Sequence, residues 1–384
     1  MNTSNDQDSM HKLPPLISDQ PALDALCENL ARAKRVAVDT EFVRDRTYFP
    51  RLCLIQIATD EALHLIDPLG GIDLAPLFSA LAEPGLEKIL HAARQDLEIF
   101  YLETGDVPRG VFDTQLAAAC LGYGEQLSYS KLVGELLGVD LGKSHARTDW
   151  IRRPLAPAQL RYAADDVLYL LRVHDELTKR LSQAGRQDWL AGEFAALSET
   201  GLYAPEPKLA YRRIRAQKNL DATRRARLAA LAQWREQMAI DKNLPRRWIV
   251  ADKPLLDLAS LDGSDPDAVR GVAGLPAKLL SRELDAICAL LSTGSEQANN
   301  FRQGSQRPTA AENRTLKKLS EFVRSEATRL KTSPALLATR DDLRQLMAGD
   351  PEDCILMQGW RRGVVGEKLS RLLQSEKPAP ETNA

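Results

Sequence analysis

Residues 35–43, "RVAVDTEFV", are the stretch that decides the fold and the chemistry of this chain. The apolar, β-branched residues with charge arriving only at the end predict a buried strand. Side chains two positions apart on a strand point to one face, so Asp39 and Glu41 should project together near its carboxyl end. Burying two carboxylates side by side is costly unless a cation compensates them. Taken alone, such an Asp-x-Glu pattern more often marks a turn after a strand.

Two further segments supply acidic residues: "HAARQDLEIF" (91–100) and "YAADDVLYLL" (162–171). The first places Asp96 near the start of a predicted helix, where a carboxylate is also a common partner of the helix dipole. In the second, Tyr162 and Asp166 lie four positions apart and share one helical face. Asp165 faces another direction and follows Arg161 by four positions, which predicts a solvated or ion-paired acid.

These acids together predict a pocket for two divalent cations that hydrolyses a phosphodiester. Carboxylate oxygens suit Mg²⁺ or Mn²⁺ rather than zinc. The five cysteines are scattered and form no C-x-x-C pair, so neither a zinc site nor a disulfide framework is indicated. We expect His91 to lie beside the site rather than to bind metal. Asp113 and Thr114 resemble catalytic residues, but capping of the following helix is the favoured interpretation.

The order of predicted elements indicates an α/β domain followed by helices. Strand patterns at 35–42, 51–59 and 61–67 follow a helix at 18–34, and helices and strands then alternate to about residue 184. This order is typical of a mixed sheet flanked by helices, as in ribonuclease H-like folds. The predicted parts are a flexible tail at 1–17, the α/β domain at 18–207, helical bundles at 208–292 and 314–376 with a linker at 293–313 between them, and a tail at 377–384.

The two helical stretches look like a divergent repeat. Trp234 and Phe322 are 88 positions apart, as are Gly271 and Gly359. Both stretches begin with a long helix and end with a Leu-rich one. We therefore predict two all-α bundles of one ancestry.

Positive charge is concentrated in one part of the chain. The net charge is −2, yet residues 208–248 hold 12 Lys and Arg against 3 Asp and Glu, a balance of +9. A cationic segment beside a catalytic domain suits attraction to a phosphate backbone. The alternative is a solvated face of a helical bundle. Arg246, Arg247 and Trp248 are either nucleic-acid contacts or parts of the core and its rim.

The composition is that of an ordinary globular protein. The N-terminal residues are polar and contain no apolar signal region, and no stretch is long and apolar enough to cross a membrane. We therefore expect a cytoplasmic protein without a membrane partner and without an obligate protein partner.

Longer segments make the chain recognisable. "VAVDTEFVRDRTYFPRLCLIQIA" (36–58), "FDTQLAAACLGYG" (112–124) and "SHARTDWIRRPLAPAQLRYAADDVLYL" (144–170) resemble the ribonuclease D family, 3′→5′ exoribonucleases of the DEDD superfamily with a Tyr-x-x-x-Asp motif. The resemblance covers about residues 20–375, and both helical stretches resemble HRDC domains, the first more clearly. It implies an enzyme that releases 5′-mononucleotides from RNA with a free 3′ end, in particular tRNA precursors.

By motif position, the resemblance assigns metal binding to Asp39, Glu41, Asp96 and Asp166 and makes Tyr162 the partner of the attacking water. Asp39 would bridge two ions, with Glu41 and Asp166 on the nucleophile side and Asp96 on the leaving-group side. A phenol with an ordinary pKa near 10 is a poor base at neutral pH, so Tyr162 is expected to orient water.

Further residues are candidates for RNA binding. Lys143, Trp150 and Arg152 lie in a polar loop, where Trp150 alternatively anchors the loop. The other candidates for RNA binding are Arg224, Arg225 and Arg227, which lie in the basic segment 208–248. We expect the helical bundles to serve RNA engagement rather than chemistry. Two other functions remain open from the residues alone: a DNA 3′→5′ exonuclease with the same pocket, and a non-catalytic RNA-binding scaffold, which the retained acids and Tyr162 argue against.

Overall fold

The computed structural model describes residues 16–142, 148–296, 309–349 and 354–375, and Lys143 lies outside these ranges. The chain forms two compact units. The described residues of 1–42, 52–203 and 308–384 make up the first unit, and those of 43–51 and 204–307 make up the second.

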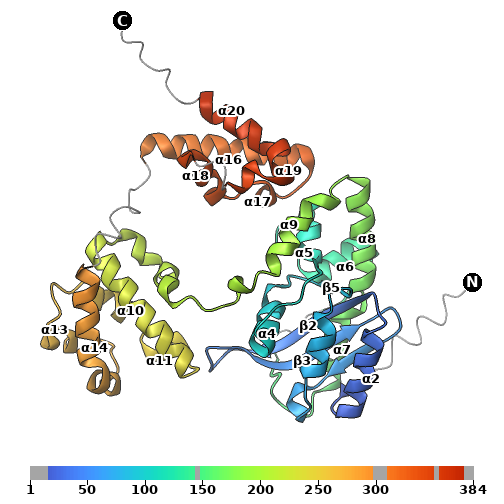
Figure 1. Cartoon of the computed structure of the whole chain (residues 1–384), viewed down its shortest axis with the longest axis horizontal. Helices are drawn as coiled ribbons and strands as arrows, with labels where there is room; N and C mark the ends of the chain where they lie inside the picture. The colour runs from blue at the N-terminus through green and yellow to red at the C-terminus, as the bar shows by residue number, and fades with distance from the viewer. Residues whose placement is uncertain (1–15, 143–147, 297–308, 350–353, 376–384) are drawn as a thin grey trace, which may run out of the picture. The chain divides into compact units, whose positions relative to one another are not determined.

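A six-stranded sheet forms the centre of the α/β part of the first unit (Figure 1). The strands are β1 (Leu16–Ile17), β2 (Arg35–Val43), β3 (Arg51–Ala58), β4 (Leu63–Ile66), β5 (Glu87–Leu90) and β6 (Val111–Asp113). Their order is β1-β4-β3-β2-β5-β6, with β2 parallel to β5, β5 parallel to β6 and β3 antiparallel to β4. The predicted mixed sheet is confirmed, and β2 occupies an interior position in it.

Successive side chains of β2 point alternately into two hydrophobic cores, one on each face of the sheet. Val36 and Val38 are buried in one core, and Ala37 is buried in the other. The first core is closed by α2 (Gln20–Leu30), α3 (Ala75–Ala82) and α4 (Arg94–Thr104). The second core is closed by α5 (Thr114–Cys120), α6 (Tyr129–Leu137), α7 (Pro157–Leu168), α8 (Leu170–Gln183) and α9 (Gln187–Leu197). Each face of the sheet therefore has its own helical layer.

The helical stretch that contains Tyr162 and ends near residue 184 is divided into two helices, α7 and α8. The helix is interrupted at Tyr169, between the end of α7 and the start of α8. The backbone N–H of Tyr169 donates to the hydroxyl of Tyr129 on α6 at 3.2 Å. A tertiary partner thus interrupts a segment whose apolar spacing is helical throughout.

The second unit is a bundle of helices with a core of its own. Its elements are η3 (Pro207–Arg213), η4 (Arg215–Asn219), α10 (Ala222–Asp241), α11 (Arg246–Ile249), α12 (Asp252–Ala259), α13 (Pro266–Arg270) and α14 (Ala277–Glu296), whereas η2 (Thr200–Leu202) ends the α/β part of the first unit. Leu228, Leu255 and Ile287 are fully buried in this core. Residues 43–51, which connect β2 to β3, belong to the same unit: Asn243 accepts the backbone N–H groups of Tyr48 and Phe49.

The C-terminal helices repeat this order of elements. They are α16 (Ala310–Leu330), α17 (Pro334–Leu337), α18 (Arg340–Ala348), η5 (Ile355–Met357), α19 (Gly359–Arg361), η6 (Arg362–Gly366) and α20 (Glu367–Ser375). A long helix, a one-turn helix with a proline at or just before its first residue, a helix of about two turns and a final helix occur in both bundles.

The C-terminal bundle is joined to the α/β part by close contacts within the first unit. The rings of Trp189 and Trp360 stack in parallel with centroids 4.3 Å apart. Arg186 donates to the carbonyl oxygen of Cys120 at 2.7 Å and to that of Leu330. Removing this bundle would expose these surfaces, so it is a structural part of the unit as well as a candidate RNA-binding module.

Gly122 offers a test of this junction. A Cβ added to Gly122 would lie 2.7 Å from the carbonyl oxygen of Lys331, whereas one added to Gly124 would meet nothing within 4 Å. Both glycines have positive φ, at 85° and 122°, so alanine strains the backbone at either position. We predict that Gly122→Ala lowers the free energy of unfolding by about 1–3 kcal/mol more than Gly124→Ala, because it adds overpacking to that strain. Urea unfolding of the two variants measures the difference. Equal losses of unfolding free energy would contradict close packing of Gly122 against Lys331 at the junction.

Candidate active site

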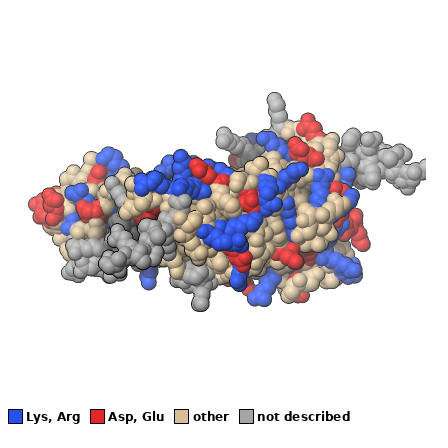
Figure 2. All heavy atoms as spheres, turned by 90° about the horizontal axis from the view of Figure 1, so that it is seen from above, with Lys and Arg blue, Asp and Glu red and all other residues tan. Residues whose placement is uncertain are grey.

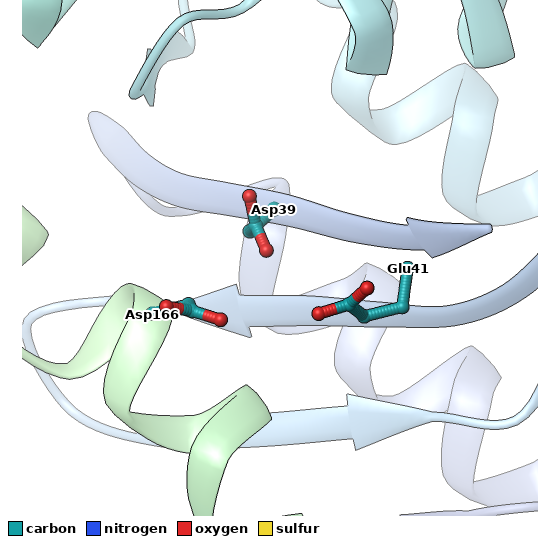
Figure 3. A group of neighbouring side chains, drawn as sticks. All are labelled: Asp39, Glu41 and Asp166. Carbon is teal, nitrogen blue, oxygen red and sulfur yellow. The ribbon is translucent and has the colours of Figure 1, made fainter. Parts of the chain in front are cut away.

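Three carboxylates converge at the end of strand β2. Asp39 and Glu41 alternate with Thr40 along β2 and lie on the face of the sheet that α7 covers. Helix α7 brings Asp166 to the same place, and the three side chains each offer a carboxylate oxygen within 4.8 Å of the others. Figure 3 shows these carboxylates around a common space, with Asp166 on the helix and the other two on the strand.

Asp96 approaches from a different layer. It lies in the first turn of α4, which covers the opposite face of the sheet, and it is buried. The hydroxyl of Thr40 donates to Asp96 at 2.6 Å. Asp96 is outside the cluster of three, although its charge still raises the pKa of Asp39. Thr40 was not predicted; its place between the two β2 acids and its orientation to the other face were the available signals.

Asp113 orients the start of α4. It is the N-cap of α5 and accepts the N–H groups of Gln115 and Leu116, so the predicted capping role is confirmed. It also accepts the N–H groups of Ala92 and Ala93 at 3.2 and 2.9 Å. Because Ala93 is the N-cap of α4, one carboxylate positions both helices, a second role that sequence spacing did not reveal.

The phenol of Tyr162 hydrogen-bonds to Asp166, as their spacing on one helix allows. Its ring lies beside that of Trp150, with centroids 6.2 Å apart. Asp165 is half-buried and does not join the cluster of three. Burial raises the pKa of Asp165, and the charge of Arg161 partly opposes this effect.

The electrostatics of the site favour a bound cation. Burial, followed by the charges of neighbouring acids, raises the pKa of Asp39 well above its ordinary value and that of Glu41 to about 8. Burial also raises the pKa values of Asp96 and Asp166 to about 7, where hydrogen bonds from Thr40 and Tyr162 act in the opposite direction. The ionised forms are therefore unfavourable without a compensating positive charge.

The donor set fits a hard divalent cation. The cluster offers carboxylate oxygens only, which suit Mg²⁺ or Mn²⁺. His91 is unsuited to ligation because its two ring nitrogens contact the hydroxyl of Thr114 and the carbonyl oxygen of Leu127, each at 2.9 Å. This agrees with the prediction that His91 lies beside the site.

The polar loop before α7 contains one buried and one exposed candidate RNA contact. Trp150 is 2% exposed and anchors the loop, so its role as a base contact is not supported. Arg152 is exposed, and its role remains a prediction. The neighbouring Arg153, which the sequence did not single out, donates to Asp67 and to the carbonyl oxygen of Cys53, each at 2.7 Å, and fixes the loop to the sheet.

The basic segment is also less uniform than its composition suggests. Arg227 is 9% exposed and donates to the carbonyl oxygen of Leu261, so it is a poor candidate for RNA contact. Arg225 donates to the carbonyl oxygens of Gln217 and Leu220, whereas Arg224 is exposed. On the face seen in Figure 2, basic and acidic side chains are intermingled.

Comparisons with known proteins agree with this architecture. Residues 14–182 match a 3′-5′ exonuclease family, and residues 224–291 match the HRDC domain family. A ribonuclease D of Gluconacetobacter diazotrophicus is 37% identical, with 94% of this chain and 92% of the relative covered. One of Acidiphilium cryptum is 38% identical, with 94% and 93% covered. The crystal structure of Escherichia coli RNase D, described as an exoribonuclease involved in structured RNA processing, is 31% identical with a TM-score of 0.80, covering 94% of this chain and 99% of that one.

The fold and the acidic site define a 3′→5′ exonuclease with an attached HRDC domain. The chain belongs to the ribonuclease D family and is a hydrolytic 3′→5′ exoribonuclease. Among the described residues, no helix is long and apolar enough to span a membrane.

The raised pKa values predict an unusual pH dependence of stability. Between the ordinary carboxyl pKa near 4 and the folded values of about 7 to 8, the metal-free folded chain binds more protons than the unfolded chain. The contribution of these groups to the free energy of unfolding should therefore be lost as pH rises through 7 to 8. Excess Mg²⁺ should stabilise more at the upper end of this window, because ligands must be deprotonated.

Urea unfolding of the wild type and Asp166→Asn in EDTA, across this pH range, measures the effect. The amide cannot ionise, so the variant should lose less stability with rising pH than the wild type. A steeper loss in the variant would contradict the mutual repulsion of these acids.

Proposed function

We propose that this enzyme removes nucleotides one at a time from the 3′ end of RNA at a site formed by Asp39, Glu41, Asp96 and Asp166, with Tyr162 beside it. Water attacks the phosphorus of the terminal phosphodiester, and the bond from phosphorus to the 3′-oxygen breaks. Each released unit is a 5′-mononucleotide, and the shortened RNA keeps a 3′-hydroxyl. The observation that carries the proposal is the convergence of three carboxylates within 4.8 Å.

The acids would hold two divalent cations, Mg²⁺ or Mn²⁺. Such ions supply charge stabilisation to the phosphate and lower the pKa of water. Asp39, Glu41 and Asp166 would together hold one ion, since their carboxylate oxygens lie within 4.8 Å of one another. Asp96 approaches from the other layer of the sheet, held by Thr40, and suits the second ion.

Tyr162 would orient the attacking water. Its hydroxyl hydrogen-bonds to Asp166, which links the phenol to the acidic cluster. A phenol at neutral pH is a weak base, so alignment is the contribution we assign to it.

The substrate class is RNA with a free 3′ end, and tRNA precursors are the substrates we propose within it. The ribonuclease D relatives and the RNase D described as acting in structured RNA processing support this choice. We further propose a cytoplasmic location and assign residues 314–376 to a second, divergent HRDC-like domain.

We predict metal-dependent, stepwise release of 5′-mononucleotides from an RNA labelled at its 5′ end. Asp39→Asn, Glu41→Gln, Asp96→Asn and Asp166→Asn should each slow this release by about 100-fold or more, because each removes part of the electrostatic support of the transition state. Asp165→Asn is the matched control and should have a much smaller effect. Gel electrophoresis resolves the successively shortened RNAs, which keep the label at the 5′ end.

Three results would contradict this function. Internal cleavage products would indicate an endonuclease, and full activity in excess EDTA would exclude metal dependence. Faster degradation of a DNA oligomer of the same sequence would favour a DNA exonuclease.

Tyr162→Phe should slow the chemical step by about 100-fold or less, since it removes one positioning hydroxyl, while RNA affinity stays near that of the wild type. Single-turnover kinetics with saturating RNA measure the step. Tyr123→Phe is a suitable control, because the phenol of Tyr123 accepts from Arg180 and is not part of the acidic cluster. An unchanged rate for Tyr162→Phe would remove this tyrosine from the mechanism.

A further inference from the structure

A cavity of about 290 Å³ lies within the second unit, and arginine is the commonest residue in its lining. The connection 43–51 contributes Arg44, Thr47 and Tyr48, and the helical bundle contributes the other walls. The lining residues of the bundle are Ala210, Arg213, Ile214, Arg235, Pro245, Arg246, Arg247 and Asp252. Five of the lining side chains are arginines and one is a carboxylate, which is the composition of an anion site.

A buried carboxylate below the cavity holds two of these arginines in place. The side chain of Glu236 is 2% exposed and pairs with Arg246 and Arg213, at 2.7 and 3.1 Å. The hydroxyl of Tyr48 donates to the same carboxylate at 2.6 Å, and the guanidinium of Arg246 lies over the Tyr48 ring. The cationic wall is therefore fixed before any ligand binds, which lowers the entropic cost of binding.

Arg235 is a buried cation in the wall of the same cavity. Its side chain is 4% exposed, and one terminal nitrogen donates to Val250 and to Asp252, at 3.0 and 2.7 Å. Its Nε is buried and has no hydrogen-bond partner among the described residues. Buried donors without an acceptor are rare and costly, so Arg235 is an incompletely satisfied cation in the wall of this cavity.

The helix α11 also presents an aromatic ring to solvent. Trp248 is 57% exposed, the most exposed large hydrophobic side chain of the described residues. It follows Arg246 and the exposed Arg247, both of which line the cavity. Arginines that bind phosphate beside an aromatic ring that stacks on a base are the usual means of binding single-stranded nucleic acid.

We propose that this cavity binds a backbone phosphate of single-stranded RNA and that Trp248 stacks on a base of the same strand. The identity of the ligand as RNA rests on the proposed function. Arg247 makes the phosphate contact from the rim, and Arg235 and Arg246 form the floor. This position replaces Arg227 as a site of RNA engagement on the bundle, because Arg227 is 9% exposed and its guanidinium donates to the carbonyl oxygen of Leu261.

The test measures the affinity of the full-length protein for a fluorescent single-stranded RNA in excess EDTA, across a salt series. Arg247→Ala should weaken binding and lower the slope of log affinity against log salt by about 0.7, the value for one lost phosphate contact on a single strand. Trp248→Ala should weaken binding by about 5- to 100-fold with an unchanged slope, because stacking releases no counterion. Arg282, an exposed arginine of α14 that does not line the cavity, supplies the control: Arg282→Ala should change neither quantity.

Three outcomes would overturn the proposal: unchanged affinity for Arg247→Ala, unchanged affinity for Trp248→Ala, or an equal loss for Arg282→Ala, which would indicate diffuse attraction only. The function is tested separately with the wild type, by release of mononucleotides from the same RNA after Mg²⁺ is added. Absence of that release would contradict the proposed function, whereas release together with insensitive variants would contradict the cavity alone.

Discussion

The cost of holding carboxylates close together and away from water is the constraint on which the site depends. Asp39, Glu41 and Asp166 lie within 4.8 Å of one another and are largely shielded from solvent, so their charged forms are costly. Packing of the helices on the sheet stabilises the fold enough to hold these three carboxylates close together. This arrangement is unfavourable in the free protein. It favours binding of a divalent cation, because the cation removes the repulsion between the carboxylates and replaces their lost hydration.

The surrounding polar contacts explain how residues from separate layers meet. Asp113 joins the starts of α4 and α5, and Thr40 joins β2 to Asp96. Neither side chain belongs to the cluster of three, yet both restrict the positions of the elements that carry the acidic side chains. Well-formed hydrogen bonds of this kind reduce the freedom of catalytic side chains, and such restriction is a large part of catalytic efficiency.

The arginines show how burial separates residues of one type. Arg227 serves the interior of the bundle, whereas Arg247 of the same segment faces a cavity and solvent. The tryptophans divide in the same way: Trp150 is buried beside Tyr162, and Trp248 is exposed. Net charge and residue type are properties of the whole segment, but access to a ligand is a property of each side chain.

The sequence by itself determined the class of fold, the strand that carries Asp39 and Glu41, and the pairing of Tyr162 with Asp166, because these depend on local periodicities of two and of about four residues. Only the tertiary structure decided that Asp96 lies in the opposite layer and is held by Thr40, that α7 ends at Tyr169, and which arginines face a cavity. These outcomes depend on contacts between residues far apart in the chain, which no local pattern encodes.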